Sequence, residues 1–131
     1  MTTTEAPVVT AGEPVPVVLG HSAIDGLAWR PLTELGDVRV KVLTSSGDCV
    51  AGILRLEPGA TERGHAHATA HHHGWVLQGE ATIAGTRVHP GTYFHVPAGA
   101  QHALTDAGPE GCEIFYLFQP EGDAPKPPVG G

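Results

Sequence analysis

The stretch Gly64-His65-Ala66-His67-Ala68-Thr69-Ala70-His71-His72-His73-Gly74 carries five of the nine histidines of the chain. His65 and His67 are two residues apart, so on a strand both imidazole rings leave the same face. His72 follows after four residues and Gly79 after six more. Neutral imidazoles are good ligands for divalent transition metals. The stretch therefore indicates a metal site built on short strands.

A second stretch downstream places one more histidine between turn residues. Gly91 is followed after five residues by Pro97-Ala98-Gly99, after two more by His102, and after three more by Asp106. Glycine and proline at these points are typical of turns, and the residues between them alternate as in short strands. A neighbouring strand would let His102 converge on the histidines of the first stretch.

Together the two stretches resemble the paired motifs of the cupin family. The first family motif is His-x-His, three or four residues, Glu, six residues, Gly, and the second is Gly, five residues, Pro-x-Gly, two residues, His, three residues, Asn. The chain departs from them at His72, where the family has Glu, and at Asp106, where it has Asn. The resemblance covers residues 37–119 and implies an all-β fold, an antiparallel jelly-roll cupin β-barrel.

The resemblance also implies a ligand set. One divalent transition metal per chain would be held by His65, His67, His72 and His102, with iron favoured and nickel, manganese, zinc or copper left open. Because a histidine replaces the anionic glutamate, the charge of the ion stays uncompensated. Such a site would favour an anionic substrate group such as an enolate or a carboxylate.

The triple histidine leaves one alternative open, because a shift of one residue moves a side chain to the other face of a strand. The spacing to Gly79 selects His72 as the ligand. However, His73-Gly74-Trp75-Val76-Leu77-Gln78-Gly79 is similar to a His-x-aromatic-Val-Leu-x-Gly stretch of three-histidine cupin dioxygenases, which cleave β-diketones or hydroxyacetophenones. That similarity would make His73 the ligand instead.

Length and composition fit one small β-domain. The chain has 131 residues, with 18 glycines, 12 prolines and a net charge of −7. The absence of a basic block argues against binding to nucleic acid or to a membrane surface. Two distant cysteines without a CxxC motif predict free thiols and a cytoplasmic location, and no basic segment typical of a secretory signal begins the chain. We expect a flexible N-terminal arm (1–16), a barrel (17–119) and a disordered Pro/Gly tail (120–131).

Turn signals recur every 8 to 12 residues and divide the barrel into short strands. An edge strand is also expected at Val15–Leu19 and a short helical turn within Ala23–Leu35, which Pro31 interrupts. The main strands are expected at Asp37–Thr44, Cys49–Leu56, His72–Leu77, Glu80–Ala84, Arg87–His89, Thr92–Val96, His102–Thr105 and Cys112–Gln119.

The favoured function is a non-haem dioxygenase that binds a small enolisable ketone or diketone as its enolate. Glu62, three residues before His65, is a candidate acid/base, and Tyr116 is a candidate catalytic residue of the last strand. The cavity would be lined from that strand by Phe115 and Leu117 or, in the other register, by Ile114 and Tyr116.

Two other functions stay open at this stage. One is a redox-neutral isomerase, cyclase or lyase that uses the same metal on a small carbonyl compound. The other is a metal or small-molecule sensor, because Trp29-Arg30-Pro31 followed by Val38–Leu43 is faintly similar to cupin domains of the anti-sigma ChrR type. The expected partners are a small-molecule substrate and a second copy of the chain. A homodimer would form by addition of the Val-rich arm 7–19 to a sheet edge.

Overall fold

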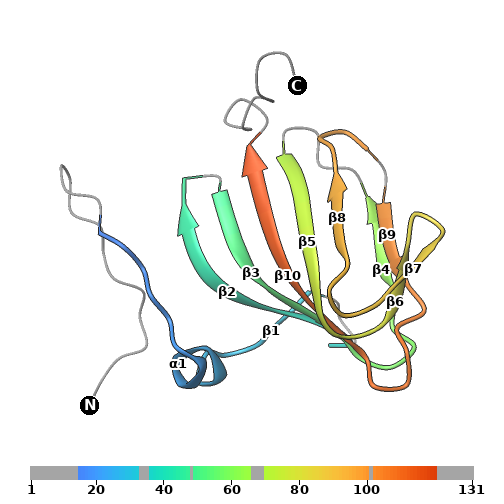
Figure 1. Ribbon diagram of the computed structural model, residues 1–131, viewed down its shortest axis with the longest axis horizontal. Coiled ribbons are helices and arrows are strands. Elements are labelled where there is room, and N and C mark those ends of the chain that lie inside the picture. The colour runs from blue at the N-terminus through green and yellow to red at the C-terminus, as the bar shows by residue number, and fades with distance from the viewer. Residues whose placement is uncertain (1–14, 33–35, 48, 66–69, 101, 121–131) are drawn as a thin grey trace.

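The computed structural model describes residues 15–32, 36–47, 49–65, 70–100 and 102–120, with side chains except at 63–65 and 102. The described elements form a barrel of two antiparallel sheets (Figure 1). The larger sheet has the strand order β1-β2-β3-β10-β5-β8, and the smaller one has the order β4-β9-β6-β7. The elements are α1 (His21–Asp25), β1 (Arg30–Pro31), β2 (Val38–Ser46), β3 (Cys49–Leu56), β4 (Glu62–His65), β5 (Ala70–Gly79), β6 (Ala81–Ile83), β7 (Thr86–Val88), β8 (Tyr93–Val96), β9 (His102–Thr105) and β10 (Cys112–Pro120).

This architecture confirms the predicted all-β, antiparallel jelly-roll barrel. Each of the eight main strands expected from the turn signals is present, with ends that differ by no more than two residues. The edge strand expected at Val15–Leu19 is absent, since that segment has no regular structure, and the helical turn begins earlier than expected, at His21. The predicted arm and tail fall mostly outside the described residues, so their boundaries stay predictions.

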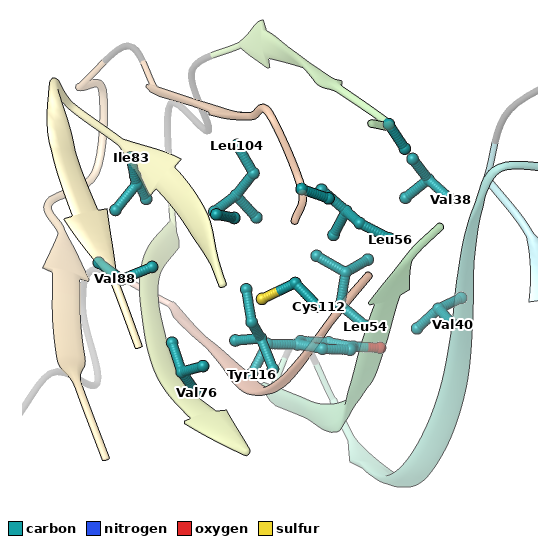
Figure 2. Close-up of a cluster of buried hydrophobic side chains, with 14 residues drawn as sticks. Val38, Val40, Leu54, Leu56, Val76, Ile83, Val88, Leu104, Cys112 and Tyr116 are labelled. Atoms are coloured by element: carbon teal, nitrogen blue, oxygen red, sulfur yellow. The ribbon is translucent and has the colours of Figure 1, made fainter. Parts of the chain in front are cut away.

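The core lies between the two sheets (Figure 2). In β2 the alternation of Val38 and Val40 with Arg39 sends the valines inward, because successive side chains of a strand point to opposite faces. Leu104 from the smaller sheet and Ile114 from the larger one are both fully buried. This packing joins the two sheets and fixes which side chains face the interior.

The short helix α1 covers the outer face of β2. Lys41 donates from Nζ to the carbonyl of Ile24 over 3.0 Å and lies 4.6 Å from the centre of the Trp29 ring. These contacts satisfy the ammonium group of a lysine that is only 6% exposed. No helix within the described residues is long and apolar enough to cross a membrane.

The backbone conformation explains why glycine stands at three positions of the two motifs. Gly79, Gly91 and Gly99 adopt φ angles of 73°, 91° and 83°, a region that other residues rarely enter. Gly79 carries a second constraint, because a Cβ there would collide with the carbonyl oxygen of Gly111. The motif spacing therefore records where the chain must turn between strands.

Substitution of Gly79 by alanine should destabilise the barrel more than the same change at an open turn. Gly85 has a similar φ of 78° but no atom near the Cβ position, so Gly85→Ala tests backbone strain alone. We expect a loss of about 1–2 kcal/mol for Gly85→Ala and about 3 kcal/mol or more for Gly79→Ala, measured by urea unfolding. Equal losses would show that the contact with Gly111 has no effect.

Candidate metal site

Both motifs lie at one end of the barrel. β4 ends at His65 and β5 begins at Ala70, while β8 ends at Val96 and β9 begins at His102. Figure 1 shows these four strand ends at the end of the barrel where β10 finishes. The fold therefore pairs positions 65 and 102, which are 37 residues apart in the chain, at the barrel end where β5 begins.

His72 lies on the inner face of β5 and is only 3% exposed. Its register partners are Phe118 of β10 and Val96 of β8. The imidazole ring lies 4.7 Å from the Phe118 ring and 5.8 Å from the Phe94 ring, centre to centre, and 6.4 Å from the Tyr116 ring. Packed aromatic rings thus hold this imidazole inside the barrel.

Two glycines make room for these aromatic rings. Tyr116 is the register partner of Gly52 on one side and of Gly74 on the other, and Gly74 is also the partner of Phe94. A Cβ on Gly52 would collide with the Tyr116 ring and hydroxyl, and a Cβ on Gly74 would collide with the Phe94 ring. The rings therefore lie across the glycines and form an aromatic layer beneath His72.

The other predicted ligands can be placed only by their backbone or not at all. His65 and His102 are direct register partners across β4 and β9. Position 102 lies on the same face as Leu104, which is fully buried, so it belongs to the inner face of the smaller sheet. The side chains of His65 and His102, and the whole of His67, lie outside the described residues.

This arrangement fits a transition metal. The buried imidazole of His72 on the larger sheet and the register positions 65 and 102 on the smaller sheet lie at the same end of the barrel, and imidazole is a preferred ligand of these ions. Among the side chains that the structure describes, no three His, Cys, Asp or Glu residues gather into a metal-binding group. Because three of the four predicted ligands lie outside that set, the ligand set stays a prediction.

Comparison with known proteins agrees with the fold and the motifs. A family model described as the ChrR cupin-like domain matches residues 21–121. The chain belongs to this cupin family. The match runs from α1 past the end of β10 and so includes both histidine motifs. No curated protein matches the chain.

Solved structures show the same fold at low sequence identity. The cupin domain of Schizosaccharomyces pombe Cnp3 is 20% identical, with a TM-score of 0.66 over 82% of this cupin and 77% of that chain. A predicted oxalate decarboxylase from Thermotoga maritima is 17% identical, with a TM-score of 0.65 over 77% and 96%. The complex of Rhodobacter sphaeroides SigE with the anti-sigma ChrR contains a chain that is 22% identical, with a TM-score of 0.63 over 72% and 50%.

His71 and His73 lie on the outer face of the cupin barrel. His73 Nδ1 is 2.7 Å from the Tyr93 hydroxyl, and its Nε2 is 3.2 Å from Oε1 of Gln119. The Nδ1 atom of His71 is 2.9 Å from Nε2 of His95. Of the two alternatives for the third ligand, only His72 lies on the face that the barrel encloses.

The two predicted catalytic residues lie on different sheets of the cupin. Glu62 is half-buried on β4, where its register partner is Leu104. Tyr116 is 5% exposed and lies in the core cluster (Figure 2). Its hydroxyl lies next to Gly52. Burial raises the pKa of Tyr116, so the phenol stays protonated at neutral pH.

The register of β10 decides which residues line the interior of the cupin. Ile114 and Tyr116 point inward, whereas Phe115 is exposed and Leu117 lies on the same outer face. Phe94 also faces the interior, yet sequence reasoning did not include it in the site. Successive side chains of β8 point to opposite faces, so Phe94 points away from the face of Tyr93. This alternation is the sequence signal that could have identified Phe94 as an interior residue.

Proposed function

We propose that this cupin is a metal-dependent enzyme that acts on a small enolisable ketone or diketone bound as its enolate, with dioxygenase cleavage as the reaction. The observation that carries the proposal is the buried imidazole of His72, which lies over an aromatic layer at the barrel end shared by His65 and His102. A site lined by aromatic rings, with neutral nitrogen ligands, suits a ketone that enters uncharged and forms its enolate anion within the site.

The charges around the site support an enolate over a dicarboxylate. Of the buried polar or charged side chains that the structure describes, His72 faces the interior and Lys41 faces α1 on the outside. The inner faces of β3, β5, β8 and β10 carry no lysine or arginine. When bound, a divalent transition metal would supply Lewis acidity towards one enolate oxygen, and iron(II) would in addition support chemistry with O₂. A second substrate carboxylate would find no cation among these residues.

The chain itself would position the substrate and move its proton. Phe94, Phe118 and the Tyr116 ring would exclude water and pack against an apolar substrate. Glu62, on the strand that ends at His65, would accept the proton from the carbon next to the carbonyl. The Tyr116 phenol, which its raised pKa keeps protonated, is available as a hydrogen-bond donor.

The test is O₂ uptake by iron(II)-loaded protein with a β-diketone. A diketone whose central carbon carries two alkyl groups and cannot enolise is the control substrate. We expect O₂ consumption in step with loss of the enolisable diketone and none with the control. His72→Ala should lower the rate more than about tenfold, while His71→Ala, which alters the outer face of the same strand, should not.

Other outcomes would favour the alternatives. Conversion of the carbonyl compound without O₂ uptake would indicate the isomerase, cyclase or lyase function. Saturable binding of the diketone without any turnover would contradict an enzyme. It would instead favour a sensor, as the ChrR name of the family suggests.

A further inference from the structure

The outer face of the larger sheet carries an apolar groove between aromatic side chains. Trp75 of β5 is the register partner of Phe115 on β10 and of Tyr93 on β8. Trp75, Tyr93 and Phe115 are 48%, 54% and 37% exposed. The groove has a volume of about 420 Å³ and an apolar lining, formed by His73, Gly74, Trp75, Tyr93, Phe115 and Leu117. We call it the aromatic groove.

The exposed area of the aromatic groove suits a short peptide segment rather than a folded partner. Aromatic side chains offer about 150–250 Å² each, so three that are roughly half exposed present about 300 Å². Each partner in a standard protein–protein interface buries about 800 Å². The groove is therefore sized for a few residues of extended chain.

The neighbouring tryptophan and tyrosine rings favour a proline-rich occupant. Proline-rich segments bind to grooves lined by aromatic side chains, because their polyproline II helix is already formed and loses little entropy on binding. Three residues complete one turn of that helix, so prolines at positions i and i+3 lie on the same side. Pro125 and Pro128, in the sequence Pro125-Lys126-Pro127-Pro128, have this spacing. The tail of this chain therefore carries the chemistry that the groove fits.

The tail also starts beside the aromatic groove. β10 ends at Pro120, three residues beyond Leu117 and five beyond Phe115. At about 3.3 Å per residue, these two side chains lie about 10 and 17 Å from the end of the strand. In a polyproline II helix, at about 3.1 Å per residue, the chain from Pro120 reaches up to about 16 Å at Pro125 and about 25 Å at Pro128. The segment is therefore long enough to turn back over the groove.

The pairing of β10 leaves its outer face as the path along which the tail can return over the strand. Both edges of β10 are paired, with β3 on one side and β5 on the other (Figure 1). Its inner face carries the core residues Ile114 and Tyr116. Gly122, two residues after the strand, supplies a position that favours a turn. The N-terminal arm is less well placed, because it leads into α1, which contacts β2 on the side of the sheet away from β5 and β8.

We propose that the proline-rich segment 125–128 of this chain docks in its own aromatic groove. A short linker gives an intramolecular contact an effective concentration in the millimolar range, so even a small apolar contact suffices. The docking would order part of the tail that the sequence predicts to be disordered. It is independent of the proposed function, since the groove and His72 lie on opposite faces of β5.

The experiment is NMR relaxation of the ¹⁵N-labelled full chain, read at the backbone N–H of Lys126. We expect an order parameter above about 0.6 in the wild-type protein and below that value in the double variant Pro125→Ala/Pro128→Ala. Pro127→Ala is the matched control, because position 127 lies on another side of the polyproline II helix. It should keep the wild-type order parameter.

The two tryptophans give a second reading in the same samples. Trp75 lines the aromatic groove, whereas Trp29 lies outside it, against Lys41. The indole N–H signal of Trp75 should shift in the double tail variant, while that of Trp29 stays in place. A Trp75 signal that is identical in wild-type and variant protein would overturn the proposal.

Substitution in the groove tests the contact from the other side. Phe115→Ser should lower the order parameter of Lys126, whereas Val42→Ser should not, because Val42 is equally exposed (37%) but lies outside the groove. The tail variants follow the last strand, so they keep the test decisive if Phe115→Ser fails to fold.

Three results would contradict the docking of the tail in this groove. The first is a Lys126 order parameter below about 0.6 in the wild-type protein. The second is an ordered tail that folded Phe115→Ser leaves unchanged, because the tail would then pack elsewhere. The third is an order parameter that rises between about 50 and 500 µM protein, because the tail would then bind a second copy rather than its own groove.

Discussion

His65→Ala and His102→Ala should each lose most of the bound metal. The two residues are register partners at one end of the barrel, and no carboxylate ligand stands at the usual motif position to compensate for a lost imidazole. We expect metal affinity to fall by at least about 100-fold in each variant, measured by competition with a chelator. His89→Ala is a suitable control, because His89 is exposed, directly follows β7 and interacts with Glu80 rather than with the predicted ligands.

The pair His72→Ala and His73→Ala tests the third ligand directly. His72 is buried on the inner face, whereas His73 contacts Tyr93 and Gln119 on the outer face. His72→Ala should therefore weaken metal binding, by less than His102→Ala if water replaces the imidazole. His73→Ala should leave the metal content unchanged. The reverse result would assign the ligand to His73, and full metal in both variants would mean a site of three histidines.

Acid should remove the metal and the stability that it confers together. Coordinated imidazoles must be unprotonated, whereas free histidines take up protons near their ordinary pKa of about 6.5. Metal binding thus depresses the pKa of its ligands in the folded protein. A base with a depressed pKa contributes stability that is present above its ordinary pKa and is lost as the pH falls below it. Metal content and Tm should both fall between about pH 6.5 and pH 5.

The check is a parallel titration of metal content and Tm, with metal-free protein as the control. The metal-free form should show a smaller change in Tm over this range, because it has no bound ion to lose. A metal content that stays flat to about pH 5 would mean either that other groups hold the ion or that protons cannot compete with it.

Local signals in the sequence account for most of the fold. Gly79, Gly91 and Gly99 mark turns that need a positive φ, so their spacing located the strands between them. The alternation of Val38 and Val40 with Arg39 in β2 agrees with the burial of both valines in the core. The short strand β4 was not predicted as an element, because its four residues include neither a β-branched nor an aromatic side chain.

The aromatic layer beneath the candidate site could not be predicted in the same way. It depends on Tyr116 lying between Gly52 and Gly74, and this pairing joins residues that are 64 and 42 positions apart in the chain. Sequence reasoning therefore left two registers open for β10. The grouping of Phe115, Trp75 and Tyr93 on the outer face has the same origin, since these residues come together only when three strands pair in register.

The metal site proposed for this cupin would hold one transition metal per chain through histidines at one end of the barrel. The most direct test is elemental analysis of protein that was purified without an affinity tag, since a histidine tag would itself carry metal. We expect about one equivalent of iron or another divalent transition metal per chain in the wild-type protein and far less in His102→Ala. Wild-type protein with well below one equivalent, even after incubation with each candidate ion and desalting, would contradict it.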